Sequence, residues 1–352
     1  MLPAAGLIGA RGRARGGRLG LLLVGLLLLG AVAPGSAQAH GATDPVASNY
    51  VARIQAVPAG MTARVVDGDL RLWLRVPRGQ AVVILDYQGA PYLRFANGRV
   101  WANQNSEMYY FNQTPPATPP PRLKRDTPPR WLQVGSGRSY EWHDGRLHAF
   151  ALEAVTPGAS KVGPWRIPLL VDGHRSAMSG TLWHRGAPSI AWLWPVAILV
   201  LCVLAGWRLN DLRIDALVAR ALAAVTLIGI SLGEIGRNLH GRPGISVVGV
   251  VELAFILALT GWTAWRVLRG RAGSLTYFLV VCAGAWQAIS LISTLLHGYV
   301  LLAVPPFVGR VATIMCIGGT IALVLPTVRL FRRENEDEPR EIAEDELAST
   351  MA

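Results

Sequence analysis

Two histidines and a glutamate lie close together in residues 140–148, which read YEWHDGRLH. The Asp-Gly dipeptide at 144–145 is typical of a two-residue β-hairpin turn. Such a turn pairs Glu141 with His148 and places both on the same face of the hairpin as His143. Imidazole nitrogens and a carboxylate oxygen form a ligand set that binds transition metal ions. The sequence therefore predicts a metal site on this face.

The other face of the same hairpin is apolar. The turn pairs Trp142 with Leu147, and we expect both side chains to point into a core. It also pairs His143 with Arg146. The alternative interpretation of the polar face is a solvated surface on which a histidine and Glu141 form a surface pair.

A further candidate ligand is created by cleavage of the chain. Residues 1–39 are organised like a secretory signal peptide, with a basic region at 11–18, an apolar run at 19–32 and an A-x-A site at 37–39. The apolar run is shorter than the roughly 20 residues that span a bilayer, which favours cleavage over an uncleaved membrane anchor. Cleavage makes His40 the first residue, and its α-amine and imidazole can chelate a metal together.

Residues 40–188 are expected to form an extracytoplasmic domain of short strands. Alternating apolar residues flank Asp-Gly-Asp at 67–69 and Asn-Gly at 97–98, and both sequences are hairpin signals. Residues 114–129 are dense in proline and are predicted to form a loop or arm. Short strands at this spacing favour an antiparallel β-sandwich of the Ig-like class.

The last hairpin of this domain suggests a family. A mature N-terminal histidine, together with a hairpin that reads Trp-Arg…Asp-Gly-His…Ser-Gly-x-Leu over residues 165–182, resembles the CopC-type periplasmic copper-binding proteins. The resemblance implies a Cu(II) ion held by the amine and ring of His40 and by Asp172 and His174. Nitrogen and oxygen ligands suit the tetragonal geometry of Cu(II). The alternative is an ordinary turn that follows an ordinary signal peptide.

The middle of the domain is similar to a different group. The sequences W-H-D, at 142–144, and D-P-V-x-S-N-Y, at 44–50, recur in uncharacterised exported membrane proteins of high-GC bacteria. The resemblance to the copper family therefore covers only the first mature residue and about twenty residues at the end of the domain.

Residues 189–330 are expected to form a transmembrane domain. Arginines gather in the loops that would face the cytoplasm and at the start of the tail, which obeys the positive-inside rule. This orientation predicts a multi-pass plasma-membrane protein with an acidic cytoplasmic tail, residues 331–352, that is disordered or a frayed helical end. The five apolar helices are placed at about 191–209, 216–235, 245–265, 275–297 and 311–330.

Four ionisable residues are expected at the outer side of this domain: Glu234, His240, Glu252 and His297. Ionisable groups at membrane depth are costly and are usually functional. The four residues would form a small ion-binding mouth that faces the β-domain. The alternative is interfacial capping, with the carboxylates neutral or paired with nearby arginines.

All three cysteines, Cys202, Cys282 and Cys316, lie in the apolar segments. The exported domain therefore contains no disulfide. The thiols are either soft Cu(I) ligands or small residues at helix contacts.

The net charge of +12 is concentrated in the signal peptide and beside apolar segments, which argues against nucleic acid as a partner. The sequence contains no nucleophile elbow, no HExxH motif and no phosphate-binding loop, so we do not expect an enzyme. The leading interpretation is an extracytoplasmic copper(II)-binding membrane protein in copper homeostasis, uptake or delivery, with a membrane domain like a shorter CopD. Its partners would be copper, the bilayer and other copper-trafficking or envelope proteins. The alternative is a membrane-anchored β-sandwich that binds an envelope protein or polymer through aromatics at 109–111.

Overall fold

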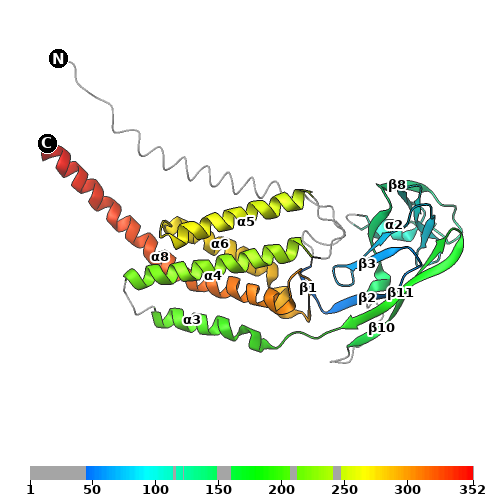
Figure 1. Cartoon of the computed structure of the whole chain (residues 1–352), viewed down its shortest axis with the longest axis horizontal. Helices are drawn as coiled ribbons and strands as arrows, with labels where there is room; N and C mark the ends of the chain where they lie inside the picture. Colours follow the sequence, from blue (N-terminus) through cyan, green and yellow to red (C-terminus); the bar gives the residue numbers. More distant parts are fainter. Residues whose placement is uncertain are drawn as a thin grey trace, which may run out of the picture.

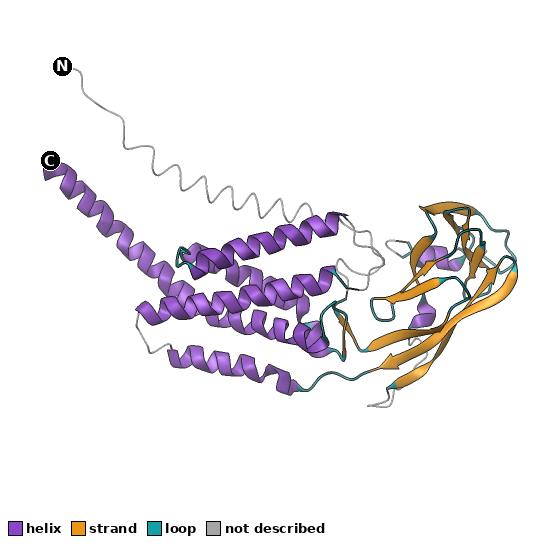
Figure 2. Cartoon of the chain, in the orientation of Figure 1, coloured by secondary structure: helices purple, strands orange, loops and turns teal. Residues whose placement is uncertain are grey.

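The computed structural model describes residues 45–113, 116–121, 123–148, 160–206, 212–240 and 247–351. The predicted signal peptide and His40 lie outside these residues. A β-sheet-rich part comes first along the chain and helices follow it, as Figures 1 and 2 show. The mixed fold class expected from the sequence is confirmed at this level.

The β-rich part contains two larger antiparallel sheets. Seven strands form one sheet in the order β2-β11-β10-β5-β6-β7-β8, and three form the other in the order β3-β4-β9. The first sheet consists of β2 (Tyr50–Ala56), β5 (Val82–Leu85), β6 (Pro91–Ala96), β7 (Arg99–Asn103), β8 (Trp131–Ser136), β10 (Lys161–Val171) and β11 (His174–His184). The second consists of β3 (Thr62–Val66), β4 (Arg71–Arg75) and β9 (Ser139–His143), and a short helix, α2 (Glu107–Phe111), follows β7.

One hydrophobic core unites the two sheets. Leu72 and Trp142 of the smaller sheet are buried in the same cluster as Ile84, Phe95 and Ile167 of the larger sheet. Each of these residues belongs to a strand whose apolar side chains alternate with more exposed ones, as a sheet with one buried face requires.

Two predicted hairpin turns are confirmed. The turn at 67–69 joins the antiparallel pair β3 and β4, and the turn at 97–98 joins β6 and β7. Asp67 and Asn97 adopt left-handed φ angles of 57° and 50°, which aspartate and asparagine tolerate better than most residues.

The predicted hairpin at 144–145 is wrong. Strand β9 ends at His143, and residues 145–147 form a 3-10 turn, η1 (Gly145–Leu147), capped by Asp144. The expected pairs of His143 with Arg146 and of Glu141 with His148 do not form. Strand β9 pairs with β4 instead, which sets Arg71 opposite His143. The Asp144 carboxylate accepts the Arg146 backbone N–H, and such a local bond competes with a strand ladder.

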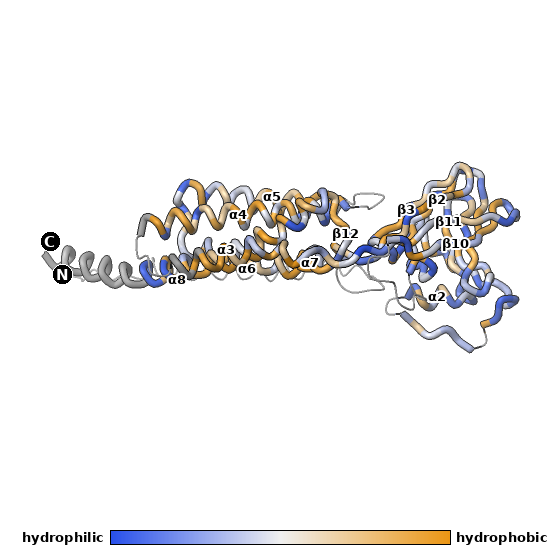
Figure 3. The backbone as a smooth tube through the Cα atoms, turned by 90° about the horizontal axis from the view of Figure 1, so that it is seen from below, coloured by the Kyte–Doolittle hydropathy of each residue, from blue (hydrophilic) through white to orange (hydrophobic). Residues whose placement is uncertain are grey.

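Within the described part of the chain, four helices are long and apolar enough to cross a membrane, over residues 214–238, 250–268, 274–296 and 306–334 (Figure 3). The first expected span, 191–209, corresponds to the 3-10 turn η2 (Ile190–Leu193) and the 13-residue helix α3. Thirteen residues of helix rise only about 20 Å. The helices are α3 (Trp194–Gly206), α4 (Leu212–Asn238), α5 (Val247–Leu268), α6 (Ser274–Leu291), α7 (Ser293–Leu296) and α8 (Pro306–Met351).

Glycines allow α4, α6 and α8 to pack closely. A Cβ on Gly229 would meet the Cys316 sulfur, one on Gly233 would meet Gln287, and one on Gly284 would meet Thr226 and Thr320. Small residues at such positions let transmembrane helices approach each other and gain dispersion energy.

The acidic tail is part of helix α8, which continues to Met351. Its first acidic residue also has a clear structural role. The Glu334 carboxylate accepts hydrogen bonds from the backbone N–H and the hydroxyl of Ser274, at the first turn of α6. A carboxylate at that position satisfies a free N–H and interacts favourably with the helix dipole. Nearby, Asp215 of α4 forms ion pairs with Arg329 and Arg333 of α8.

Candidate metal site

The structure brings His143 and His148 together. Their ring centroids are 4.8 Å apart, with an angle of 38° between the ring planes. His143 ends β9, and His148 follows the η1 turn. The predicted proximity of the two rings is therefore confirmed, although a 3-10 turn and not a hairpin produces it.

A carboxylate lies behind one of the two rings. Asp69 Oδ2 is 3.1 Å from His148 Nδ1, and the Asp69 side chain is largely buried. In metal sites a carboxylate typically holds one ring nitrogen of a histidine, which fixes the tautomer while the other nitrogen binds the metal. The sequence marked residues 67–69 only as a turn, so this role of Asp69 was missed.

Glu141, the third predicted ligand, has another partner. Its Oε1 atom lies 2.8 Å from Arg71 Nη1, and Arg71 also forms an ion pair with Asp67. Arg71 stands opposite His143 in the β4–β9 pair, so it occupies the face on which Glu141 was expected to bind a metal. Throughout the described part of the chain, no group of three or more His, Cys, Asp or Glu side chains is placed to hold a metal ion. The site thus offers two imidazoles, with Asp69 as a supporting carboxylate.

A buried ion pair fixes the segment between the two histidines. Asp144 Oδ1 is 2.8 Å from Arg146 Nε, and Asp144 Oδ2 is 2.7 Å from Arg146 Nη2 and 3.0 Å from Trp142 Nε1. Arg146 Nη1 also donates to the carbonyl of Leu85 at 2.9 Å. The Asp144 side chain is completely buried, so this two-pronged pair anchors the turn on the core.

Tyr87 and Asn112 form hydrogen bonds to the backbone of the segment from His143 to His148. The Gly145 N–H donates to the Tyr87 hydroxyl at 2.8 Å, and burial, followed by the charge of Asp144, raises the pKa of Tyr87 to about 12. The side-chain amide of Asn112 accepts the His143 N–H at 2.7 Å and donates to the His143 carbonyl at 3.1 Å. The backbone on each side of the candidate site is therefore fixed by hydrogen bonds.

The candidate site lies at the end of the β-rich part that faces the helices. A Cβ on Gly68, next to Asp69, would lie 3.3 Å from Leu301 Cδ1 and 3.3 Å from Ser48 Cβ. Leu301 follows β12 (Tyr299–Val300), which pairs with β1 (Ala47–Ser48) between the two parts of the molecule (Figure 1).

Hydrogen bonds connect the β-rich part to the helices close to this site. The Gly298 N–H donates to Asn49 Oδ1 at 2.9 Å, and the Arg185 N–H donates to the Asn49 carbonyl at 2.9 Å. The buried Arg310 of α8 donates to the carbonyls of Gly298 and Thr294 at 3.0 and 3.1 Å. We call Asn49, Arg185, Gly298 and Arg310 the joint. The Ser-Asn-Tyr sequence at 48–50 thus has a structural role.

The predicted primary ligands Asp172 and His174 lie at the other end of the β-rich part. Asp172 adopts a left-handed φ of 49° in the β10–β11 turn, and its Oδ1 accepts the Ala81 N–H at 2.8 Å. The carboxylate therefore stabilises a turn. His174 is exposed beside it.

The first described residues of the chain are distant from this turn. From His174 to His184, strand β11 extends about 33 Å at the usual rise of a strand. The Leu301 N–H donates to the carbonyl of Val46, which therefore lies beyond the His184 end of β11, beside the helices. Asp172 and His174 are therefore a strand's length from the first described residues. His40, the third residue of the predicted set, lies outside the described residues.

Of the four described residues of the predicted mouth, no three are placed together to hold a metal ion. Glu234 accepts a hydrogen bond from Asn238 at 3.2 Å and lies 3.8 Å from Arg237, as the capping alternative expects. His297 Nδ1 lies 3.0 Å from its own helix carbonyl at Ser293.

Glu252, another member of the predicted mouth, is exposed on α5 and interacts electrostatically with Glu234. Burial lowers the pKa of His240, which follows α4. Of the cysteines, Cys316 is buried against Gly229, Cys282 is exposed, and the side chain of Cys202 lies outside those described.

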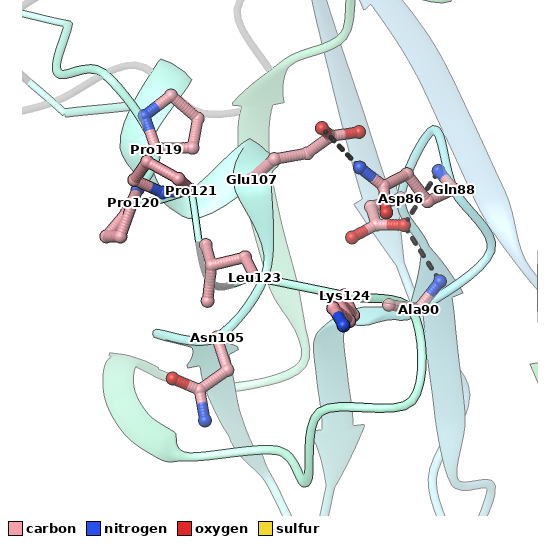
Figure 4. A pocket seen from close by; sticks show the side chains of 10 residues that line it. All are labelled: Asp86, Gln88, Ala90, Asn105, Glu107, Pro119, Pro120, Pro121, Leu123 and Lys124. Carbon is pink, nitrogen blue, oxygen red and sulfur yellow. Dashed lines mark hydrogen bonds between the residues drawn. The ribbon is translucent and has the colours of Figure 1, made fainter.

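The proline-rich arm borders a separate hollow of about 220 Å³ (Figure 4). Asp86 has its carboxylate turned to the backbone, where it accepts the N–H groups of Gln88 and Ala90, and Glu107 accepts the Gln88 side-chain amide at 3.1 Å. The polar groups of the hollow are therefore largely used within the fold. Nearby, Tyr87 and Phe111 are partly exposed and their rings lie 6.3 Å apart.

Compared with protein-family models, with curated proteins and with solved structures, the chain gives no match in any of the three comparisons. The chemistry of the site is therefore inferred from its geometry.

Proposed function

We propose that the protein is an extracytoplasmic copper(II)-binding membrane protein whose metal site is the pair His143 and His148. The observation that carries this proposal is the 4.8 Å separation of the two rings, with Asp69 held against His148. The β-rich part acts as a sandwich domain outside the plasma membrane. The helices, α3 included, form a five-span anchor with the tail in the cytoplasm.

Copper(II) is the cargo that fits two imidazoles best. Imidazole binds zinc, copper and nickel, and Cu(II) binds a given nitrogen site most tightly of the divalent first-row metals. Water supplies the remaining positions of the tetragonal coordination sphere. In this proposal His143 and His148 bind the metal in place of His40, Asp172 and His174. The protein would then share with the CopC-type proteins the metal and the type of domain, but not the ligands.

The helical part serves as an anchor in this proposal. The close packing of α4, α6 and α8 through Gly229, Gly233 and Gly284 supports this role, because tightly packed glycines leave little room for an ion between the helices. The joint keeps the histidine pair close to the outer surface of the membrane. A metal site in that position can capture copper outside the cell membrane and deliver it to a partner there.

Copper binding to the whole purified protein in detergent tests the proposal. The wild type is expected to bind one Cu(II) per chain, with nitrogen hyperfine splitting in its electron paramagnetic resonance spectrum. Replacing His143 or His148 by alanine should weaken binding more than about 100-fold, and Asp69→Asn should weaken it about 10–100-fold because the ring loses its orienting carboxylate. Affinity should fall as the solution is acidified, since imidazole binds metal only after it loses its proton.

His174→Ala is the matched control, because His174 is exposed at the opposite end of the β-rich part. Its copper affinity should equal that of the wild type. Weaker binding by His174→Ala, or by a chain with one alanine added before His40, together with unchanged binding by His143→Ala, would support the ligand set of the copper family. It would overturn the site proposed here.

The orientation is tested separately with reporter fusions. A reporter inserted at Pro188, between β11 and α3, is expected to be active outside the cytoplasm. A reporter joined after Ala352 is expected to be active inside it, because an odd number of spans separates the two positions. Activity of both fusions on the same side would contradict five spans and would indicate that α3 does not cross the membrane.

A further inference from the structure

A second hollow lies at the end of the β-rich part that is farthest from the helices. Its volume is about 380 Å³. Three connections meet there: the segment between β4 and β5, the β6–β7 turn, and the β8–β9 turn. We call this hollow the distal groove. Its lining comprises Val76, Pro77, Arg78, Gly79, Gln80, Phe95, Ala96, Asn97, Gly98, Arg99, Gly137 and Arg138.

The distal groove is strongly basic. Arg78, Arg99 and Arg138 come from three different connections, and none of the lining residues is acidic. Among the described residues, no carboxylate forms an ion pair with any of these three arginines. The adjacent Asp172 is bonded to the Ala81 N–H. Three arginines thus line one hollow whose lining contains no acidic residue.

The main chain is accessible at three glycines that line the distal groove. Gly79, Gly98 and Gly137 have left-handed φ angles of 82°, 69° and 102°, and a Cβ on any of them would meet no atom within 4 Å. Turns of this kind suit glycine and let a ligand approach the main chain closely. The main chain of three turns around the groove is therefore open to a ligand.

We propose that the distal groove binds a phosphate group of an anionic polymer outside the membrane. A phosphate offers several oxygen acceptors in different directions, which suits arginines that come from three separate connections, whereas a carboxylate offers two oxygens in one plane. A volume of about 380 Å³ accommodates one phosphorylated unit of a chain.

Lipid head groups of the protein's own bilayer do not reach the groove. Residue Ala81, next to the lining residue Gln80, is bonded to Asp172 at the far end of β11, and that strand extends about 33 Å from the joint. A ligand in the groove therefore comes from the space beyond the membrane. The site is independent of copper binding, because the histidine pair lies at the opposite end of the same β-rich part.

The test uses the full chain in nanodiscs of uncharged phosphatidylcholine, with fluorescent inorganic polyphosphate as the probe. The wild type is expected to bind it with an affinity that falls steeply as salt is added. Arg99→Gln and Arg138→Gln are each expected to weaken binding about tenfold, because each removes one charged hydrogen-bond donor. Arg166→Gln, an exposed arginine on β10 outside the groove, should change binding less than about twofold.

A second probe of similar charge, poly-glutamate, separates phosphate from carboxylate recognition. Weaker binding of poly-glutamate, combined with loss of polyphosphate binding only in the groove variants, supports the proposal. Equal weakening by Arg166→Gln overturns it in favour of diffuse attraction to a basic surface. Equal or tighter binding of poly-glutamate overturns it in favour of an acidic protein partner. The thermal unfolding temperature of each variant, which should be unchanged, excludes misfolding as the cause.

Discussion

Asp144→Ala is expected to lower the free energy of unfolding of the β-rich part by about 3–5 kcal/mol, the usual cost of breaking one partner from a buried ion pair. The Asp144 side chain is completely buried and pairs with Arg146 at 2.7 Å. Without it the guanidinium of Arg146 keeps its charge in a largely buried position, and the indole N–H of Trp142 loses its acceptor. Urea unfolding of the whole protein, followed by circular dichroism, measures the change.

Asp126→Ala is the matched control, because Asp126 is an exposed aspartate on the proline-rich arm, and it should change stability by less than about 0.5 kcal/mol. A double variant, Asp144→Leu with Arg146→Met, should regain much of the lost stability, since removing both charges leaves none unpaired. If Asp144→Ala costs less than about 1 kcal/mol, the pair does not anchor the turn between the two histidines. In that case His143 and His148 would have no fixed separation.

Gly298→Val is expected to open the joint. A Cβ on Gly298 would collide with the backbone carbonyls of Arg185 and Gly186, and backbone atoms cannot move aside as a flexible side chain can. Overpacking of this kind costs about 1–3 kcal/mol, which raises the open population roughly 5- to 150-fold. The peptide bond after Arg185 should then be cut by trypsin about ten times faster, as measured by limited proteolysis of the full chain.

Gly186→Val is the control for that experiment, because a Cβ on Gly186 would meet no atom within 4 Å. It introduces the same side chain one residue after the cleavage point without touching the joint. Equal cleavage rates for Gly298→Val and the wild type would show that the joint does not restrain the β-rich part. Equal acceleration by both variants would show that the added valine, and not the joint, changes the rate.

The sequence by itself determined the features that depend on neighbouring residues. The turns at 67–69 and 97–98 form as predicted because Asp-Gly and Asn-Gly adopt left-handed backbone angles at low cost. The long apolar segments also form helices as predicted, because length and hydrophobicity are properties of a single segment.

The same local rule failed at residues 144–145. There the Asp144 carboxylate finds stronger partners in Trp142 and Arg146, and Arg146 in turn reaches the Leu85 carbonyl, 61 residues away along the chain. The preference of Asp-Gly for a hairpin turn contributes less free energy than a buried ion pair with several hydrogen bonds. The proximity of the two histidine rings was predicted, but the backbone that produces it was not.

Only the tertiary structure decided what surrounds the site. Asp69 and His148 are 79 residues apart, and Asn49 and Gly298 are 249 residues apart. No periodicity or turn signal reports such pairs, because they depend on strand order and register across the whole sheet. The same reason explains why the position of Asp172 and His174 was not predicted. The resemblance to the copper family grouped them with His40, but they lie a strand's length from the joint, near which the described chain begins.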